Sequence, residues 1–191
     1  MRQVALLFIS GLLTITSFAQ DKKDLAVSFS AGIFTSPYYY DTKAREYYSV
    51  DFDYHITARH ILSASFNSGK HSYNDSISSV LPVTENTWNT RASYLTFSIL
   101  YKYKFLNTEK ISANIGAGAG IMTHIRQYLW SPTYGDGSQS VWTDLTFPVR
   151  LDLDYKVSKL LRIGIIGGLF IHPDYPVLGY HVGPRLSYVI K

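Results

Sequence analysis

Charged side chains recur at every second position in several stretches of this 191-residue sequence. In "VDFDYHITA", residues 50–58, the aspartates Asp51 and Asp53 alternate with apolar or aromatic residues. Side chains two positions apart on an extended chain point to the same side, so these carboxylates share one face. Acidic and basic groups on a common face either form ion pairs with one another or line a path for ions. The charged residues placed in this way are Asp51, Asp53, Lys102, Arg150, Asp152, Asp154, Arg162 and Arg185.

Histidine is the other residue type here that could supply catalytic or metal-binding chemistry. Four of the six histidines share the face of the charged set, namely His55, His124, His172 and His181, whereas His60 and His71 lie in or beside predicted connections. An enzyme acting on lipid would need a His and a Ser together on the opposite, apolar face, and no such pair occurs at a shared height. No two histidines have the spacing of metal ligands, and the sequence has no Cys. We therefore predict a protein that is not an enzyme, with no catalytic residue, no cofactor and no metal site.

The elements that must position these residues are β-strands. Period-two alternation of apolar and polar residues is typical of a strand with different surroundings on its two faces. Eight such segments predict an all-β fold, and they cover residues 24–34, 46–58, 61–71, 92–105, 110–126, 144–157, 161–172 and 179–190.

The connections between the segments alternate in length. Three of them are only a few residues long ("RH", "LNTE" and "SKL"), whereas the others are mostly much longer. Short turns at one end and longer loops at the other are typical of a transmembrane barrel, so we predict an eight-stranded antiparallel up-and-down β-barrel. Pro148 and Pro184 fall inside predicted strands, and we expect a local bulge at each because proline removes a ladder hydrogen bond.

Composition is consistent with a membrane location and with a single domain. Charged residues make up 17% of the chain, which is below the roughly 25% usual in soluble domains. The net charge of +4 is small and the basic residues are scattered, so nucleic acid is not a predicted partner.

The N-terminus has the features of an export signal. A basic start is followed by the apolar run "VALLFISGLLTI" and by small residues at Ser17 and Ala19. We predict a signal peptide over residues 1–19 and a barrel domain over residues 20–191. The absence of Cys excludes a disulfide framework and an acylated N-terminal cysteine.

Tyrosines indicate which face of the strands meets lipid. Tyr54, Tyr101, Tyr103, Tyr155 and Tyr188 all fall on the apolar face, near the ends of segments that lead to one side of the barrel. Amphipathic rings settle at the level of lipid headgroups, so these residues predict a membrane-interface girdle, and the charged set then faces a closed lumen. A second belt is predicted from Tyr48, Trp130, Trp142 and Tyr180, and the lipid-facing positions include Phe52, Leu95, Phe97, Ile115, Leu151 and Ile165.

In its layout the sequence resembles the small OmpX/OmpA-type outer-membrane β-barrel domains of Gram-negative bacteria. The C-terminal targeting pattern of such barrels is matched by His181, Gly183, Leu186 and Tyr188, although three residues follow the final aromatic residue. The resemblance implies an outer-membrane location, with lipids and the barrel-assembly machinery as partners.

For function, a lumen filled by paired charges favours a structural or surface-interaction role. The loops 35–45, 72–91 and 127–143 would then offer the contact surface for an extracellular ligand that the sequence does not identify. The alternatives are a narrow channel for small solutes or ions, a lipopolysaccharide-modifying enzyme, and a soluble lipocalin-like periplasmic binding barrel.

Overall fold

The computed structural model describes residues 24–37, 42–73, 90–128, 139–173 and 178–190. The predicted signal peptide lies outside these residues and remains a prediction. Within the described ranges, no helix has the length and apolar character needed to cross a membrane. The strands are β1 Leu25–Thr35, β2 Lys43–His55, β3 His60–Tyr73, β4 Thr90–Asn107, β5 Ile111–Tyr128, β6 Gln139–Lys156, β7 Leu161–Ile171 and β8 Gly179–Ile190.

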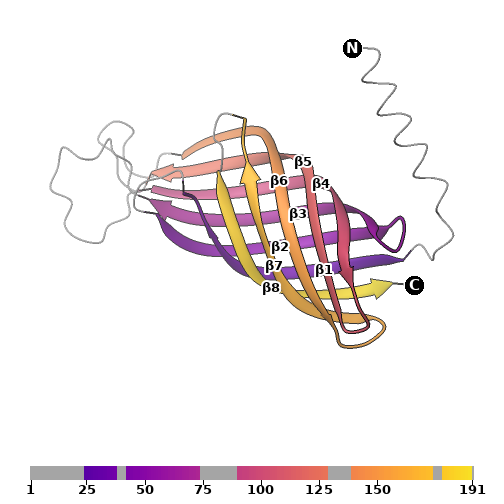
Figure 1. The fold of residues 1–191 in the computed structure, drawn as a ribbon. Helices are drawn as coiled ribbons and strands as arrows, with labels where there is room; N and C mark the ends of the chain where they lie inside the picture. The colour runs from indigo at the N-terminus through magenta and orange to yellow at the C-terminus, as the bar shows by residue number, and fades with distance from the viewer. Residues whose placement is uncertain (1–23, 38–41, 74–89, 129–138, 174–177, 191) are drawn as a thin grey trace, which may run out of the picture.

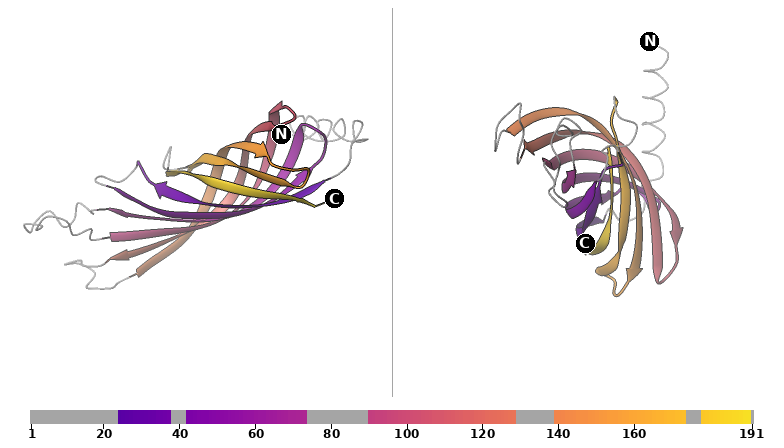
Figure 2. Two further views of the ribbon diagram at one scale, coloured as in Figure 1. Left: turned by 90° about the horizontal axis from the view of Figure 1, so that it is seen from below. Right: turned by 90° about the vertical axis from the view of Figure 1, so that its left-hand side faces the viewer.

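These eight strands form a closed barrel in which each strand pairs antiparallel with the next, and β8 pairs with β1. The predicted fold class is therefore confirmed. Figure 1 shows the barrel from the side, and the right-hand view of Figure 2 looks from the end that carries the longer connections. Leu25 pairs with both Tyr54 and Ile190, so the start of β1 and the end of β8 lie together at the other end, with the short turns.

The three short turns share one hydrogen-bonding pattern. A hydroxyl side chain at Thr57, Thr108 and Ser158 accepts the backbone N–H three residues later, at distances of 3.1, 3.0 and 3.0 Å. Ser and Thr hydroxyls favour turns because they satisfy backbone donors that the strand ladder leaves unpaired. The same side-chain-to-backbone hydrogen bond thus stabilises all three hairpin turns at the short-turn end of the barrel.

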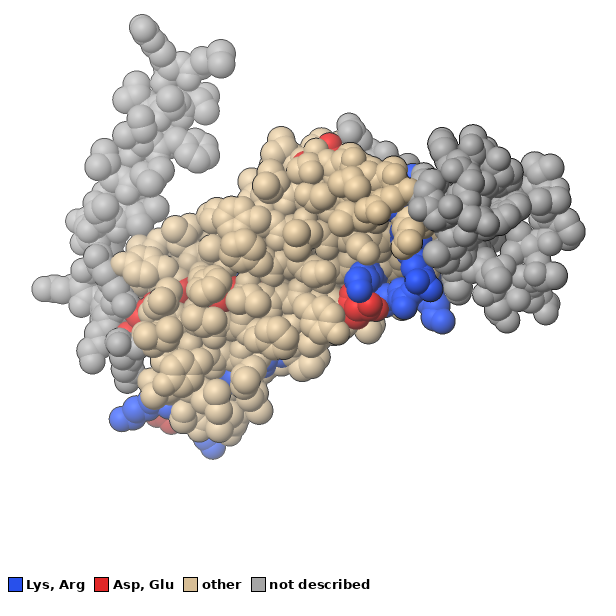
Figure 3. Space-filling model, turned by 180° about the vertical axis from the view of Figure 1, so that it is seen from behind, with Lys and Arg blue, Asp and Glu red and all other residues tan. Residues whose placement is uncertain are grey.

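Solvent exposure alternates along the strands, with apolar side chains outside and polar side chains inside, as the period-two pattern predicted. Phe52 is 42% exposed on the outside, whereas its neighbours Asp51 and Asp53 are 0% and 5% exposed inside the barrel. The other predicted lipid-facing residues, Leu95, Phe97, Ile115, Leu151 and Ile165, are all exposed too. On the face drawn in Figure 3 the middle of the surface carries few charged side chains, and clusters of Lys and Arg lie towards the two ends.

The bulges expected at the two prolines are not present, so that prediction is wrong. Pro148 pairs with Phe170 of β7, and Pro184 pairs with Ile165 of β7, both in an unshifted register. Each strand residue donates its N–H to only one neighbour, so a proline removes a bond from one ladder and leaves the other ladder intact. Register shifts among the described strands lie instead between Ala44 and Tyr47 in β2 and between Lys104 and Leu106 in β4.

The exposed apolar surface leads to a test of depth in the membrane. Leu151 lies outside, near the middle of the apolar surface, and is 50% exposed, whereas Val157 follows β6 at the short-turn end and is 52% exposed. We expect Leu151→Arg to lower the free energy of unfolding in phospholipid vesicles by about 2–4 kcal/mol, because a guanidinium is poorly solvated in hydrocarbon. Val157→Arg, the matched control, should cost at most about 1 kcal/mol. Urea titration read by the gel mobility of unheated samples measures both, and equal costs would contradict the assignment.

Candidate functional site

Four charged side chains form an alternating ring across the lumen. Lys102 Nζ lies 3.0 Å from Asp53 Oδ1 and 3.0 Å from Asp152 Oδ2. Arg185 completes the ring, with Nη2 at 2.6 Å from Asp53 Oδ2 and Nη1 at 2.5 Å from Asp152 Oδ2. The members come from β2, β4, β6 and β8, so every second strand of the barrel contributes one charge. The ring thus connects opposite walls through ion pairs.

A second ion pair lies beside this ring. Arg150 Nη1 lies 2.6 Å from Asp51 Oδ1, and Arg150 Nη2 donates hydrogen bonds to Ser65 Oγ at 3.0 Å and Asn67 Oδ1 at 2.7 Å. Ser65 Oγ donates to Asp51 Oδ1 at 2.6 Å, and Tyr47 OH donates to Asn67 Oδ1 at 2.8 Å. These contacts join β6 to β2 and β3 across the lumen. We call the alternating ring and this pair together the luminal ion network.

Burial makes this network energetically demanding. All six charged members are at most 5% exposed, and three acids face three bases, so the group is neutral as a whole. A buried ion pair gains little net stability over an apolar replacement, but removing one partner strands an uncompensated charge. Space for the network is provided in part by Gly116, where a Cβ atom would lie 2.6 Å from Cγ of Lys102.

Two predicted members of the charged set take other positions. Asp154 is 2% exposed, but among the described residues it makes no ion pair within the network. Arg162 is half-buried and lines a pocket at the short-turn end together with Lys104 and Lys156. The sequence placed both residues on the correct face, but it could not show which acid meets which base.

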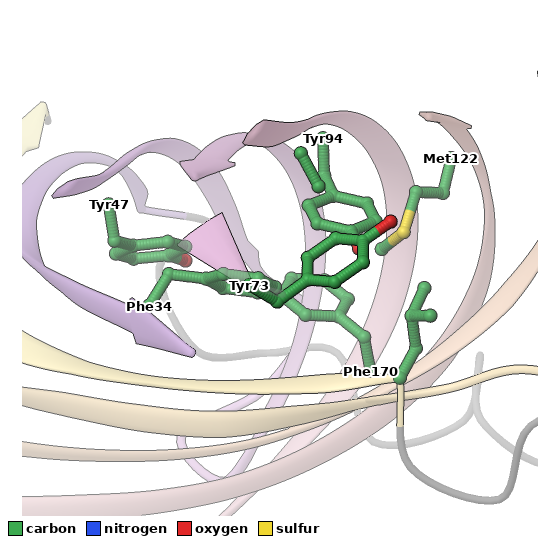
Figure 4. Packing of buried hydrophobic residues seen from close by; sticks show 8 residues of the cluster. Phe34, Tyr47, Tyr73, Tyr94, Met122 and Phe170 are labelled. Carbon is green, nitrogen blue, oxygen red and sulfur yellow. The ribbon is translucent and has the colours of Figure 1, made fainter. Parts of the chain in front are cut away.

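An aromatic cluster fills the lumen on the side of the longer connections. Its side chains point inward from several strands, and Figure 4 shows Tyr73, Tyr94 and Phe170 converging near Met122. Tyr47 links this aromatic cluster to the luminal ion network, since its hydroxyl donates to Asn67. Its ring stacks on His181 at 4.1 Å between centroids. The cluster comprises Phe34, Tyr47, Tyr73, Ala92, Tyr94, Met122, Phe170 and Leu178.

The ring of Phe34 fits because glycine occupies two neighbouring positions. A Cβ atom on Gly69 or Gly179 would lie 2.8 or 2.3 Å from an atom of that ring. Phe34 in turn packs against Tyr94 and Phe170, with ring centroids 5.3 and 6.1 Å apart. Polar and aromatic layers therefore fill successive levels of the lumen.

The histidines fall into different surroundings. His55 and His181 are buried inside the barrel, as their alternation predicted, and His60 is near the outer surface, where Nδ1 contacts Tyr101 OH. His71 was expected in or beside a connection, and it lies near the end of β3, where it is 0% exposed inside the barrel. His124 and His172 come together with Asp144, a grouping that sequence spacing did not indicate because the three residues belong to different parts of the sheet.

Within the described ranges, the aromatic residues predicted for the membrane interface lie on the outside with one exception. Tyr54, Tyr101, Tyr155 and Tyr188 are 37–52% exposed, and Tyr103 is half-exposed. In the second belt, Tyr48 and Tyr180 are exposed, and Trp130 lies outside the described residues. Trp142 stacks on the buried ring of His124 and faces the lumen, so its place in an outer belt is wrong. The alternation of β6 continues to Gln139, beyond the predicted segment, and this puts Trp142 on the inner face.

The C-terminal pattern lies on β8, with His181 on the inner face and Leu186 and Tyr188 on the outer face. Its role as a targeting signal stays a prediction.

No family model matches the sequence, and no curated protein matches it. Solved structures do match. Neisserial surface protein A has a TM-score of 0.62 at 11% identity, over 87% of this chain and 99% of that protein. Ail, the attachment invasion locus protein of Yersinia pestis, solved with the heparin analogue sucrose octasulfate, has a TM-score of 0.55 at 14% identity, over 88% of this chain and 100% of that one. The outer membrane protein OprG from Pseudomonas aeruginosa has a TM-score of 0.55 at 10% identity, covering 88% and 97% of the two chains.

At these identities the likeness concerns the fold. With its closed ring of eight strands, its apolar exterior and its charged interior, the chain has the fold of the solved outer-membrane β-barrels that it resembles.

Proposed function

We propose that this chain is an outer-membrane protein of a Gram-negative bacterium with a filled, non-conducting lumen, and that it acts at the cell surface through the end that carries its longer connections. The luminal ion network is the observation that carries this proposal. An eight-stranded barrel has an interior only just wide enough for side chains to fill. The Arg150–Asp51 pair and the alternating ring cross the lumen, and the aromatic cluster occupies the next level, so we expect no continuous water path.

The inside-out distribution of polarity argues against a soluble binding barrel. A lipocalin-like protein would need an apolar cavity for its ligand and a polar exterior. Here the buried side chains inside the barrel include Asp51, Lys102 and Arg185, and the exterior carries large apolar residues such as Phe29 and Leu145 at more than half exposure. Such an exterior suits a bilayer.

A surface role is supported by the rim at the end with the longer connections. Arg45, Lys70 and Arg91 line one groove there together with Glu46, whose carboxylate lies 3.1 Å from Lys70 Nζ. Lys and Arg side chains gather near this end in Figure 3. Two of the similar barrels have names that refer to a surface protein and to attachment. The predicted loops 72–91 and 127–143 lie largely outside the described residues, and loop 35–45 does so in part, so the ligand stays unnamed.

We propose that the chain is not an enzyme. A lipid-modifying barrel needs a histidine beside a nucleophile or base on its lipid-facing rim. His60, the histidine nearest the outer surface among the described residues, instead contacts the hydroxyl of Tyr101 and stacks against its ring.

Location is tested by fractionation. We expect the mature chain, expressed in a Gram-negative host, to be recovered with outer membranes and to migrate faster on a gel when unheated than after boiling, because folded barrels stay compact in detergent. A soluble periplasmic species without this mobility difference would refute the proposed location.

Lumen filling is tested by removing charge from the network. We expect Asp51→Asn/Asp53→Asn to destabilise the barrel by about 3–5 kcal/mol, because the change leaves Arg150 buried without its carboxylate partner and leaves Lys102 and Arg185 to share the single carboxylate of Asp152. Urea titration in vesicles measures the loss. Glu109→Gln, at an exposed turn position, is the control and should change stability by less than about 0.5 kcal/mol.

Planar-bilayer recording separates the filled barrel from a channel. The unmodified protein should give no stable conductance steps. Steady conductance, together with a double variant that keeps its stability and changes its ion selectivity, would establish a water-filled path lined by charged rings and would overturn the proposal.

A further inference from the structure

We propose that His124, Asp144 and His172 form a binding site for a divalent transition-metal ion on the inner wall of the barrel, near the end with the longer connections. One ring nitrogen from each histidine and one carboxylate oxygen of Asp144 all lie within 4.8 Å of one another. This inference does not depend on whether the lumen conducts.

The strand register explains why the three side chains meet. His124 lies on β5, Asp144 on β6, and His172 directly after the last residue of β7. In the β5–β6 ladder Asp144 pairs with Met122, which is two residues from His124 on the same face. In the β6–β7 ladder Phe147 pairs with Ile171, so His172 also comes beside the inward face of β6. The central strand therefore presents a carboxylate between imidazoles from its two neighbours.

The geometry is close to that of a ligand set. His172 Nε2 lies 3.3 Å from Asp144 Oδ2. The two imidazole rings are nearly perpendicular, with centroids 6.0 Å apart and an interplanar angle of 87°. Three donors on adjacent strands would close around an ion by small rotations of side chains, without movement of the backbone.

An independent observation comes from His124 itself. Its side chain is 2% exposed, and Nε2 has no hydrogen-bond partner among the described residues. Buried polar atoms are nearly always satisfied, so an unpaired nitrogen on an imidazole that is grouped with a carboxylate and a second imidazole points to a ligand. The ring is also held in place, because Trp142 stacks on it at 5.0 Å between centroids with an interplanar angle of 12°.

The donor set selects the class of ion. Two imidazole nitrogens with one carboxylate oxygen suit Zn²⁺ and similar transition metals, whereas Ca²⁺ and Mg²⁺ prefer all-oxygen surroundings. Three protein ligands leave at least one coordination position for water. The side chain of Asp144 is 39% exposed and that of His172 is 2% exposed, so an ion would exchange through the carboxylate side.

One nearby group weakens the site. The guanidinium of Arg126 lies 4.8 Å from the centre of the Trp142 ring, on the strand that carries His124. Its positive charge opposes a cation, and only one carboxylate in the set offsets it. We therefore expect an exchangeable ion rather than one held permanently.

The test uses the mature chain, refolded in detergent and freed of any polyhistidine tag, because a tag would itself bind metal. Zn²⁺ titration by calorimetry should give one ion per chain. Co²⁺ bound in its place should give visible absorption bands whose intensity reports the coordination number. His124→Gln, Asp144→Asn and His172→Gln should each weaken Zn²⁺ binding by more than about tenfold.

Controls separate this site from adventitious binding. The chain has six histidines, and His60 lies at the short-turn end near the outer surface, so His60→Ala should leave the affinity unchanged. The mobility difference between unheated and boiled samples shows that each variant folds. Asp144→Asn changes little in shape and is partly exposed, so it decides the matter if the histidine variants do not fold.

Two results would overturn the proposal. One is the absence of Zn²⁺ binding by the folded, unmodified chain. The other is binding that persists in Asp144→Asn and disappears in His60→Ala, which would place the ion on the outer surface.

Discussion

The ring of Asp53, Lys102, Asp152 and Arg185 is the interaction on which the remaining structure depends. In a bilayer, the outward-facing apolar side chains contribute little to the choice between strand arrangements, because lipid tails are as apolar as the side chains. The interactions that favour one arrangement of strands over another must therefore lie largely in the lumen. Four charges from alternate strands satisfy one another only when all eight strands are aligned correctly. A slip of one residue in any of them would turn a buried charge towards hydrocarbon.

The aromatic cluster performs a different task at the next level of the lumen. Rings such as Phe34 and Tyr94 fill volume without requiring charged partners, and Tyr47 joins them to the polar layer through Asn67. Packing of this kind tolerates adjustment in a way that ion pairs do not. The lumen thus combines a layer that specifies alignment with a layer that excludes water.

Much of this fold could be read from the sequence, because period-two alternation is a local property. The strand segments, the outward face of Leu151 and the inward face of Asp51 follow from it directly. The partners across the lumen do not, since they depend on the stagger between strands distant in sequence. Asp154 and Arg162 have the right parity yet make no ion pair in the network among the described residues.

Pairing between strands cannot be derived from one strand alone, and this explains the wrong predictions at Trp142 and at the two prolines. It also explains why the sequence did not reveal the grouping around Asp144. The alternation of β6 extends farther than its apolar residues indicated, which brings Trp142 inside. Pro148 affects one ladder only, which a single strand considered alone cannot reveal. Three ligands on three adjacent strands have no characteristic spacing along the chain.

The hydroxyl-capped turns at Thr57, Thr108 and Ser158 have a consequence for the order of assembly. Each turn joins two strands that are adjacent in the chain, so the hairpins β2–β3, β4–β5 and β6–β7 form at small cost in loop-closure entropy. The seam between β1 and β8 is different, because it joins Leu25 to Ile190 at opposite ends of the described chain. Contacts of such long range are slow to form, and we expect closure of this seam to be the last and slowest step of folding.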